Sequence, residues 1–289
     1  TCTSRRVSMK EDLPSLQAAL GDRYRLSGEL GHGGMATVYL AEDSDTGYLV
    51  AVKVLRRELT AILGATRFQR EIEILTRLRH PRIVPVLDSR DAGGRLYYVM
   101  PYISGQSLRD KLVRENSLPL TEVMRIASDI ATAVDYAHEN GVLHRDIKPA
   151  NVLLEGGRAL MCDFGVARAI EVAGSESFSS GGLVVGTPAY MSPEQATGGE
   201  VDQRSDVYAF GCVLYEVLAG EPPFTGPTAQ AIVARQLSGS PPPLTTVRPD
   251  LPADIQSALF RALDVDPANR PGSAGLLVSL LSDRDPTGG

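Results

Sequence analysis

The sequence has few cysteines, no tryptophan and no excess of positive charge. Its three cysteines, Cys2, Cys162 and Cys212, form no CxxC pair. That spacing provides neither a disulfide framework nor a zinc knuckle, and it fits a reducing compartment. The formal net charge of −6 argues against a general nucleic-acid-binding protein, because such proteins normally carry a basic excess. We therefore expect no nucleic acid among the partners.

Long apolar runs are missing as well. No stretch approaches the roughly 18–20 apolar residues that a membrane-spanning helix needs, and residues 1–12 lack the apolar centre of a secretory signal. A hydrophobic content of 43% with 22% charged residues is typical of a folded globular protein. We expect no membrane contact within this chain and a cytoplasmic location, either as it stands or as the cytoplasmic domain of a larger membrane-anchored protein.

The first third of the chain is predicted to be rich in β-strands. Short β-favouring runs are separated by turn-forming residues, and they predict strands at Tyr24–Leu30, Thr37–Ala41, Val50–Leu55, Ile83–Leu87 and Leu96–Val99. One helix is expected among them at Arg67–Arg79, where apolar residues recur with helical spacing. Another short helix is expected before the strands, around Leu13–Leu20.

From Ser107 onward the pattern becomes helical. Thr121 is placed to cap a helix that runs to about His138, and Asp206–Leu218 is apolar on most faces, as in a helix enclosed by its own domain. The predicted fold class is α+β, with a β-rich first lobe that contains one key helix, a larger and mainly helical second lobe, and a cleft between them. The expected divisions are 1–22 as a leader or short helical extension, 23–102 and 103–284 as the two lobes, and 285–289 as a tail or the start of a linker.

A glycine-rich stretch lies between the first two predicted strands. Gly31, Gly33 and Gly34 let the backbone approach phosphate oxygens closely, which makes them candidate nucleotide-binding residues. Ala36 stands where a third glycine of the G-x-G-x-x-G pattern is usual. A plain hairpin turn explains the stretch about as well, and the absence of a GK[ST] ending argues against a P-loop NTPase.

A lysine follows on the third predicted strand. Alternation along Val50–Lys53 directs Lys53 to the same face as Ala51, opposite the valines. A buried ammonium group needs an anionic partner, and the predicted helix offers Glu71. Glu73 is a competitor, but residues two apart do not share a helix face, so we predict Glu71. A solvated strand lysine is the alternative reading.

Two later runs are more specific: HRDIKPAN at residues 144–151 and DFG at residues 163–165. Together with the glycine-rich stretch, the lysine and the acidic helix residue, they resemble the motif set of the eukaryotic-type (Hanks-type) serine/threonine protein kinases. The resemblance runs from about Tyr24 to Leu281, and the stretches GGMATVY and SPEQATG are most like the bacterial branch. It implies a bilobal protein kinase fold, and transfer of the γ-phosphoryl group of ATP to serine or threonine hydroxyls of proteins.

The resemblance also implies roles for individual residues. Asp146 would accept the proton of the substrate hydroxyl, and Lys148 would reach the γ-phosphate and the attacking oxygen. Lys53, held by Glu71, would contact the α- and β-phosphates. Hard oxygen ligands suit magnesium, so two residues would hold Mg²⁺, with Mn²⁺ as a substitute: Asn151 and Asp163.

The adenine ring is expected at the junction of the lobes. By the resemblance Met100 is the gatekeeper, and the Pro101 carbonyl with the backbone of Ile103 makes the hinge hydrogen bonds. Relatives usually carry an acidic residue in place of Pro101, but proline keeps its carbonyl acceptor. Cys162 would line the back of the pocket, or is simply a small buried residue. Three apolar residues would enclose the ring: Val38, Ala51 and Leu153.

The segment Gly186–Glu194 resembles the end of a kinase activation segment, with Ser-Pro-Glu in place of Ala-Pro-Glu. The resemblance implies that Glu194 pairs with Arg270 in the helical lobe. It also implies that Asp206 anchors the backbone of the catalytic loop.

Serine/threonine preference is implied by Lys148 and by Thr187 in the substrate segment. Relatives with an arginine before the catalytic aspartate, here Arg145, are commonly switched by phosphorylation of the activation segment. We predict autophosphorylation on at least one serine there, which makes another copy of the chain a candidate partner beside protein substrates. Ser179 and Ser180 are favoured among four candidates: Ser175, Ser177, Ser179 and Ser180.

Two other classes of function are weighed against this prediction. A catalytically silent pseudokinase or scaffold would keep the fold, but it usually loses at least one of four groups that are all present here: Lys53, Asp146, Asn151 and Asp163. A small-molecule kinase is disfavoured by the segment Gly186–Glu194, because relatives seat a protein substrate there.

Overall fold

The computed structural model describes residues 13–165 and 187–282. These residues fall into two compact units, one formed by 13–69 with 86–102 and the other by 70–85 with 103–165 and 187–282. The first unit is mainly β-sheet and the second mainly helix. This is the α+β class that the sequence predicts.

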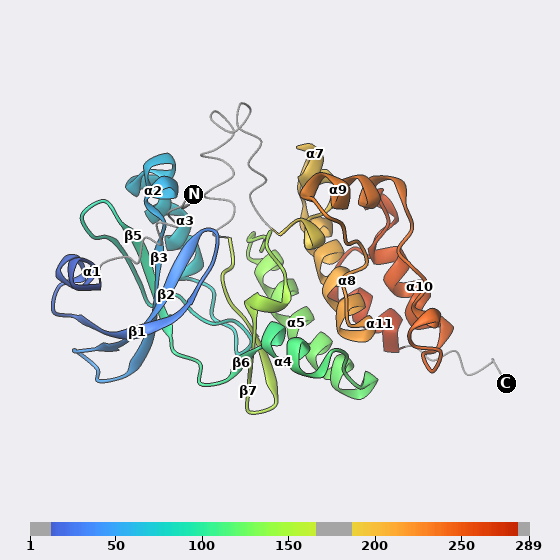
Figure 1. Cartoon of the computed structure of the whole chain (residues 1–289), viewed down its shortest axis with the longest axis horizontal. Helices are drawn as coiled ribbons and strands as arrows, with labels where there is room; N and C mark the ends of the chain where they lie inside the picture. The colour runs from blue at the N-terminus through green and yellow to red at the C-terminus, as the bar shows by residue number, and fades with distance from the viewer. Residues whose placement is uncertain (1–12, 166–186, 283–289) are drawn as a thin grey trace, which may run out of the picture. The chain divides into compact units, whose positions relative to one another are not determined.

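The first unit contains a five-stranded antiparallel sheet with the strand order β1-β2-β3-β5-β4 (Figure 1). Helices α1 (Leu13–Leu20), α2 (Arg57–Leu63) and the start of α3 (Ala65–Leu75) accompany it. The short helix predicted before the strands is therefore confirmed, whereas α2 was not predicted. The strands are β1 (Tyr24–His32), β2 (Ala36–Asp43), β3 (Leu49–Leu55), β4 (Asp88–Asp91) and β5 (Leu96–Pro101).

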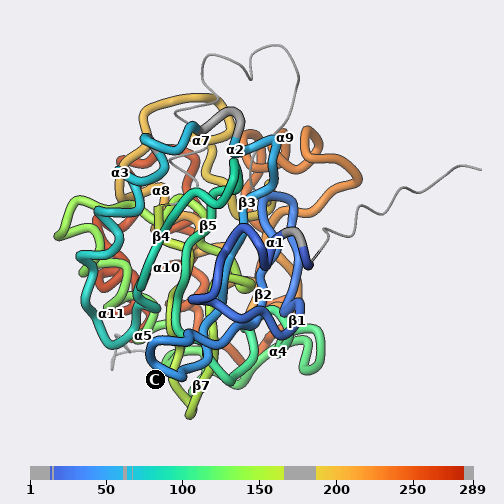
Figure 2. Tube along the Cα trace, turned by 90° about the vertical axis from the view of Figure 1, so that its left-hand side faces the viewer, coloured from blue at the N-terminus to red at the C-terminus, as the bar shows by residue number. Residues whose placement is uncertain are grey.

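Helix α1 packs against one face of this sheet (Figure 2). Leu16 and Leu20 are buried with aromatic and aliphatic residues of the strands, which removes their apolar surface from water. The Gln17 side chain fixes the junction, because it donates to the carbonyls of Gly21 and Tyr24 and accepts the N–H of Leu26. Helix α1 is thus part of the core of the first unit.

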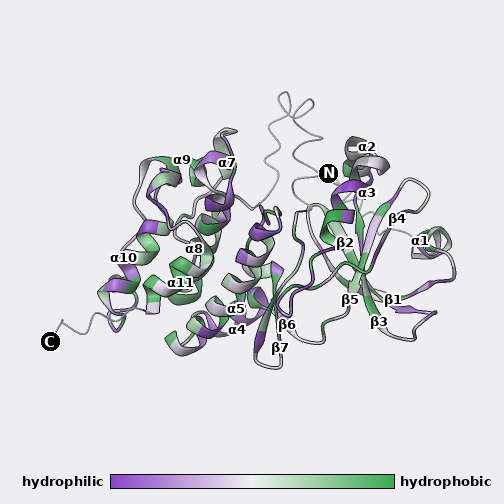
Figure 3. Cartoon of the chain, turned by 180° about the vertical axis from the view of Figure 1, so that it is seen from behind, coloured by the Kyte–Doolittle hydropathy of each residue, from purple (hydrophilic) through white to green (hydrophobic). Residues whose placement is uncertain are grey.

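The second unit begins its own small sheet, β6-β7-β8, directly after the first unit ends at Tyr102. Gly105, just before β6, lies so close to the backbone of β7 that a side chain would not fit. A Cβ atom there would lie 1.8 Å from the carbonyl oxygen of Leu154. Helix α8 is buried along most of its length, as predicted, and α11 is largely hydrophobic (Figure 3). The elements are β6 (Gln106–Ser107), α4 (Leu108–Glu115), α5 (Leu120–Glu139), η1 (Pro149–Asn151), β7 (Val152–Glu155), β8 (Arg158–Met161), η3 (Pro188–Tyr190), α7 (Pro193–Thr197), α8 (Gln203–Ala219), α9 (Ala229–Ser238), η4 (Leu244–Thr246), α10 (Ala253–Ala262), η5 (Pro267–Asn269) and α11 (Ala274–Ser282).

The strand predicted at Ile83–Leu87 is wrong. Ile83 makes an isolated bridge to Met161, and the strand β4 begins only at Asp88. Pro85 interrupts the run, because proline lacks the N–H that a ladder needs. The apolar composition of the run reflects burial of Ile83 and Val84 in a loop and not strand pairing.

Two predicted helix ends also differ. Helix α5 starts at Leu120 with Pro119 in the N-cap position, so Thr121 lies inside the helix and is not its cap. Helix α3 ends at Leu75 instead of Arg79. Beyond Leu75 the chain continues in tighter turns, with hydrogen bonds from Arg77 to Ile74 and from Leu78 to Leu75.

Residues 70–85 group with the helical unit, although the sequence assigned them to the first lobe. Arg82 pairs with the buried Asp129 of α5 at 2.8 Å, and the Arg82 carbonyl accepts the N–H of Met161 in β8. The His80 ring stacks on Tyr136 of α5 at 5.0 Å between centroids. The second half of α3 and the loop after it are therefore anchored by α5 and β8.

Candidate active site

The catalytic loop lies between α5 and η1 in the second unit and brings three predicted residues into contact. The Lys148 ammonium lies 2.6 Å from Oδ2 of Asp146. The Asn151 side-chain nitrogen donates to the Asp146 carbonyl at 2.8 Å and to Oδ2 at 3.1 Å. The Asp146 side chain remains 19% exposed, so its carboxylate is held by neighbours and still open to a substrate hydroxyl.

Asp206 anchors this loop from beneath, as predicted. Its carboxylate accepts the backbone N–H groups of His144 at 2.7 Å and Arg145 at 2.8 Å, and it also accepts from His138 Nε2 at 2.7 Å. Burial alone would raise the pKa of Asp206, but the hydrogen bonds from His138 and from the backbone outweigh it and lower that pKa. The carboxylate therefore stays charged and holds the loop at its first two residues.

The buried His144 ring supports the aspartate that follows it. His144 Nε2 donates to the Cys162 carbonyl at 3.0 Å, which leaves Nδ1 to accept the N–H of Asp146 at 3.3 Å. Burial lowers the pKa of His144, so the ring is neutral and keeps this donor–acceptor pattern. The ring also packs on Phe164 at 4.5 Å between centroids. The HRD and DFG runs are thus joined through one imidazole.

The two predicted metal ligands flank the β7–β8 hairpin in the sequence: Asn151 directly precedes β7, and Asp163 follows β8. The Asn151 carbonyl accepts the N–H of Cys162, the residue before Asp163, at 3.0 Å. Because the side-chain nitrogen of Asn151 donates to Asp146, the amide oxygen is the atom available as a ligand. An amide oxygen and the Asp163 carboxylate are hard donors of the kind that magnesium prefers, so the residues fit this ion.

The glycine-rich stretch connects β1 and β2 in the first unit. Among residues 13–165 and 187–282, a Cβ atom on Gly31 or Gly34 would meet no atom within 4 Å, and one on Gly33 would meet only the Ala36 carbonyl at 3.9 Å. These three glycines are not among the described residues with positive φ. Neither backbone strain nor close packing within the chain requires glycine here. The space that side chains would fill suits a ligand that approaches the backbone closely, such as a phosphate group.

The strand β3 carries Lys53 as the sequence predicts. The valines of β3 lie in the core with α1, so Ala51 and Lys53 share the opposite face. In the sheet register Lys53 lies beside Val38 of β2, and Ala51 lies beside Met100 of β5. The Lys53 ammonium lies 5.9 Å from the Tyr98 ring centroid. The sheet thus places Val38 directly beside Lys53, and the pair of Ala51 and Met100 two residues further along the same strands β3 and β5.

The remaining predicted contacts concern both units and stay predictions. Pro101 ends β5 in the first unit, whereas Ile103 and Leu153 belong to the second unit. Glu73 has a side chain that is 67% exposed and pairs with Arg77, while Glu71 is partly buried. This difference favours Glu71 over Glu73 as the partner of Lys53.

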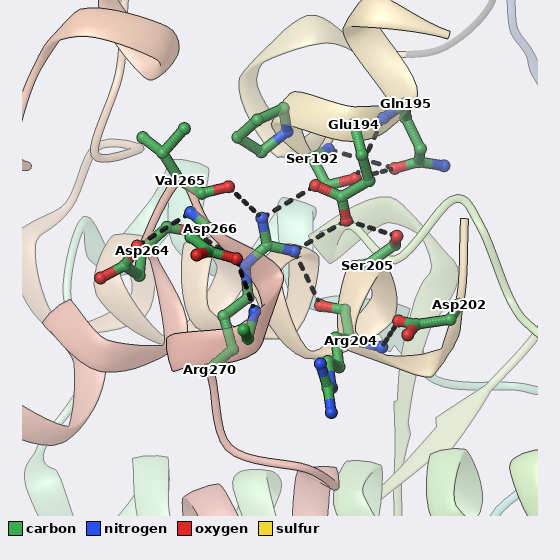
Figure 4. Close-up of polar contacts among 12 residues, drawn as sticks. Ser192, Glu194, Gln195, Asp202, Arg204, Ser205, Asp264, Val265, Asp266 and Arg270 are labelled. Carbon is green, nitrogen blue, oxygen red and sulfur yellow. Dashed lines mark hydrogen bonds and ion pairs between the residues drawn. The ribbon is translucent and has the colours of Figure 1, made fainter. Parts of the chain in front are cut away.

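Glu194 and Arg270 form the predicted ion pair, which is buried in the second unit (Figure 4). The guanidinium binds both carboxylate oxygens, at 2.7 and 2.8 Å. Burial alone would raise the pKa of Glu194, but the hydrogen bonds from Arg270 and Ser205 lower it. The rest of the guanidinium is satisfied by three backbone carbonyls: Arg204, Asp264 and Val265.

A second buried network holds the segment that follows Thr187, and the sequence reading missed it. Glu216 of α8, whose side chain is 2% exposed, binds Arg109 of α4 through both oxygens and accepts the Tyr190 hydroxyl at 2.5 Å. Arg109 also donates to the Tyr190 hydroxyl. Gln236 of α9 donates to the Pro188 carbonyl at 2.8 Å. Three helices therefore fix η3, directly after the predicted substrate residue.

The predicted phosphorylation candidates cannot be placed. They lie outside the described residues: Ser175, Ser177, Ser179 and Ser180.

The sequence of this chain is similar to those of known protein kinases, in agreement with the site described above. Residues 24–280 match the protein kinase domain family. The chain is 42% identical over 257 residues to the serine/threonine-protein kinase PknB of Mycobacterium tuberculosis, which covers 87% of this chain and 41% of that protein. It is 38% identical over 270 residues to pkn2 of Myxococcus xanthus, covering 91% of this chain and 32% of that protein. The chain thus spans less than half the length of these curated relatives.

The fold of this chain is also similar to solved structures of kinases. The kinase domain of PknI from Mycobacterium tuberculosis has a TM-score of 0.72 and 33% identity, covering 90% of this chain and 95% of that one. A structure of Rad53 in complex with AMP-PNP has a TM-score of 0.74 and 27% identity, covering 90% of this chain and 66% of that one.

The fold and the motif residues define a protein kinase domain, and the chain belongs to the protein kinase family. These curated relatives are bacterial serine/threonine kinases, which confirms the predicted resemblance to the bacterial branch. Protein kinases use ATP with a divalent metal and act on proteins. Within the described residues, no helix is both long and apolar enough to cross a membrane.

Proposed function

We propose that this chain transfers the γ-phosphoryl group of ATP to serine and threonine hydroxyls of protein substrates. The observation that supports it most is the contact of Lys148 and Asn151 with Asp146, on a loop that Asp206 holds in place. In this proposal Asp146 accepts the hydroxyl proton, and Lys148 neutralises charge on the transferred group. Lys53, oriented by Glu71, holds the α- and β-phosphates.

Magnesium is the metal in this proposal, with manganese as a substitute. Asn151 and Asp163 would hold it through oxygen atoms. When bound, the metal neutralises charge on the phosphate oxygens. The chain's own contribution would be these two oxygen ligands, of which Asn151 contacts Asp146.

The wider role is also proposed. The substrates are proteins, a second copy of the chain is one of them through trans-autophosphorylation, and the location is cytoplasmic. Arg145, next to the base, would bind a phosphate on the activation segment, where Ser179 and Ser180 are the favoured acceptors.

The test is incubation with γ-labelled ATP, magnesium and a generic acceptor protein, followed by phospho-amino-acid analysis. We expect labelled phosphoserine or phosphothreonine, and label reduced at least about 100-fold with Asp146→Asn. Phosphotyrosine alone would contradict the proposed specificity. No transfer by the wild-type chain would leave the pseudokinase alternative as the better account.

Autophosphorylation is tested separately by intact mass after incubation with ATP and magnesium. We expect added phosphate on the wild-type chain and none on Asp146→Asn. The combined Ser179→Ala and Ser180→Ala variant should lose most of it. An unchanged mass, under conditions in which the enzyme modifies an acceptor protein, would refute this part of the proposal.

A further inference from the structure

Gln195 in α7 uses both ends of its side-chain amide, and Figure 4 shows the end that contacts Ser192. Oε1 accepts the N–H and the hydroxyl of Ser192, both at 3.1 Å, and so closes the capping box of the helix. Nε2 donates to the carbonyl of Arg145 at 3.1 Å. A backbone N–H only donates and a carbonyl only accepts, so these partners fix which end of the amide is which. One side chain therefore joins the end of the substrate segment to the catalytic loop.

The contacted residue has an unusual backbone. Arg145 has φ of +65°, in the left-handed region that residues with a side chain rarely adopt. Its N–H donates to Asp206 at 2.8 Å, and its carbonyl accepts from Gln195. The strained residue is thus held on both sides, by two separate helices.

The peptide unit between Arg145 and Asp146 is held at both of its polar ends. Its carbonyl accepts from Gln195, and its N–H donates to His144 Nδ1 at 3.3 Å. A peptide unit is planar, so fixing both polar groups fixes the orientation of the plane. Together with the φ angle of Asp146, that orientation sets the direction in which the Asp146 side chain leaves the backbone.

We propose that Gln195 is a positioning residue for the catalytic base. Through Arg145 it fixes the peptide plane before Asp146, and through Ser192 it ties that plane to the segment that seats the protein substrate. This inference rests on the proposed function, since it assigns Asp146 as the base. Gln195 itself touches neither nucleotide nor substrate in this account.

Two substitutions separate the two ends of the amide. Gln195→Glu keeps an oxygen for Ser192 and loses the donor to Arg145. Gln195→Met has a similar length and loses both. The matched control is Gln203→Glu, because Gln203 also donates its side-chain nitrogen to a backbone carbonyl, that of Gly272 at 2.9 Å, without contacting the catalytic loop. For each we would measure kcat, the KM values for ATP and acceptor protein, and Tm.

For Gln195→Glu we expect kcat to fall about tenfold, equivalent to about 1.4 kcal/mol in the activation barrier, with KM for ATP and Tm unchanged. Gln195→Met should show a similar loss of kcat and a Tm lowered by about 2–4 °C, because its capping box is also lost. Gln203→Glu should keep the wild-type kcat. A merely structural role would instead lower Tm and kcat together, and would not spare Tm in Gln195→Glu.

Wild-type kcat in the folded Gln195 variants, or an equal loss in Gln203→Glu, would overturn the proposal. Either Gln195 variant decides the question if the other does not fold. An active wild-type chain with fully active Gln195 variants would refute this inference alone. A wild-type chain that transfers no phosphate would refute the proposed function, and this inference with it.

Discussion

Arg270 makes a large set of buried hydrogen bonds in this domain. All of its N–H groups have partners, because the guanidinium binds both oxygens of Glu194 and three backbone carbonyls. Its side chain has no exposed surface. The planar fork of arginine suits such a site better than the point charge of lysine would. The ion pair joins the end of the activation segment to the loop before α11.

Loss of this side chain should destabilise the domain strongly. Arg270→Met leaves the Glu194 carboxylate buried without its cation, and breaking a buried pair costs about 3–5 kcal/mol. We expect the free energy of unfolding in urea to fall by that amount. The control is Arg77→Met, because Arg77 forms an exposed ion pair with Glu73 of the kind that contributes about 0.3–0.5 kcal/mol. Equal effects of the two substitutions would contradict this view of the buried pair.

The lowered pKa of His144 implies that the free energy of unfolding depends on pH. Burial lowers its pKa in the folded state below the usual 6.5, so below pH 6.5 the unfolded chain binds a proton that the folded chain does not. The stabilisation is present above pH 6.5 and is lost as the pH falls towards the folded pKa. The slope from this group is at most about 1.4 kcal/mol per pH unit.

Urea unfolding between pH 7.5 and pH 5 tests this dependence. His144→Gln should reduce the slope below pH 6.5. The comparison is His32→Gln, which removes a histidine whose side chain is 77% exposed. A slope that His144→Gln leaves intact would mean that other groups cause it.

At the scale of elements, neither packing nor backbone conformation requires the glycines of the turn between β1 and β2. Its glycines face open space, whereas Gly105 lies against the backbone of β7 and cannot carry a side chain. The same residue type therefore serves two different purposes in this chain. In the turn, glycine keeps the backbone accessible. At residue 105, glycine permits close packing against β7.

Gly34→Ala should affect nucleotide binding and not folding. The added methyl group meets no atom of the described residues within 4 Å, and a Gly→Ala change at a compatible site stabilises a protein by about 0.4–1 kcal/mol. We expect an unchanged or slightly raised Tm, together with a KM for ATP raised about tenfold, the effect of losing roughly one hydrogen bond.

The matched control is Gly272→Ala. A Cβ atom at Gly272 also meets nothing within 4 Å in the part of the chain that the structure describes, but this residue lies before α11 in the second unit. Its KM for ATP should match the wild type. A KM that Gly34→Ala leaves unchanged would show that the turn is open for another reason.

At the scale of the whole molecule, local features were predicted from the residues themselves, whereas distant contacts were predicted only where the family resemblance implied them, as for Glu194 with Arg270. The residues around Asp146 lie within five positions of each other, so a contiguous motif identifies them. Alternation in β3 placed Lys53 correctly because a strand has a fixed period of two. The contacts of Glu216 with Arg109 were missed because 107 residues separate these two side chains.

Some missed features did leave a signal in the sequence. Ser192 and Gln195 have the S-x-x-Q spacing of a capping box, so α7 and its cap were predictable. The bond from Gln195 to Arg145 was not, because it depends on how α7 is placed against the catalytic loop. The false strand at Ile83–Leu87 shows the opposite error, since buried apolar residues also occur in anchored loops.

The central claim is that Asp146 takes part in the chemical step and not in nucleotide binding. Single-turnover transfer from pre-bound, γ-labelled ATP to an acceptor protein tests it most directly, with the wild type and Asp146→Asn compared at equal nucleotide occupancy. We expect the rate of the chemical step to fall about 10²–10⁴-fold, the contribution of a positioned base, while the affinity for ATP stays within about threefold. An Asp146→Asn variant that transfers phosphate at the wild-type rate would contradict the account.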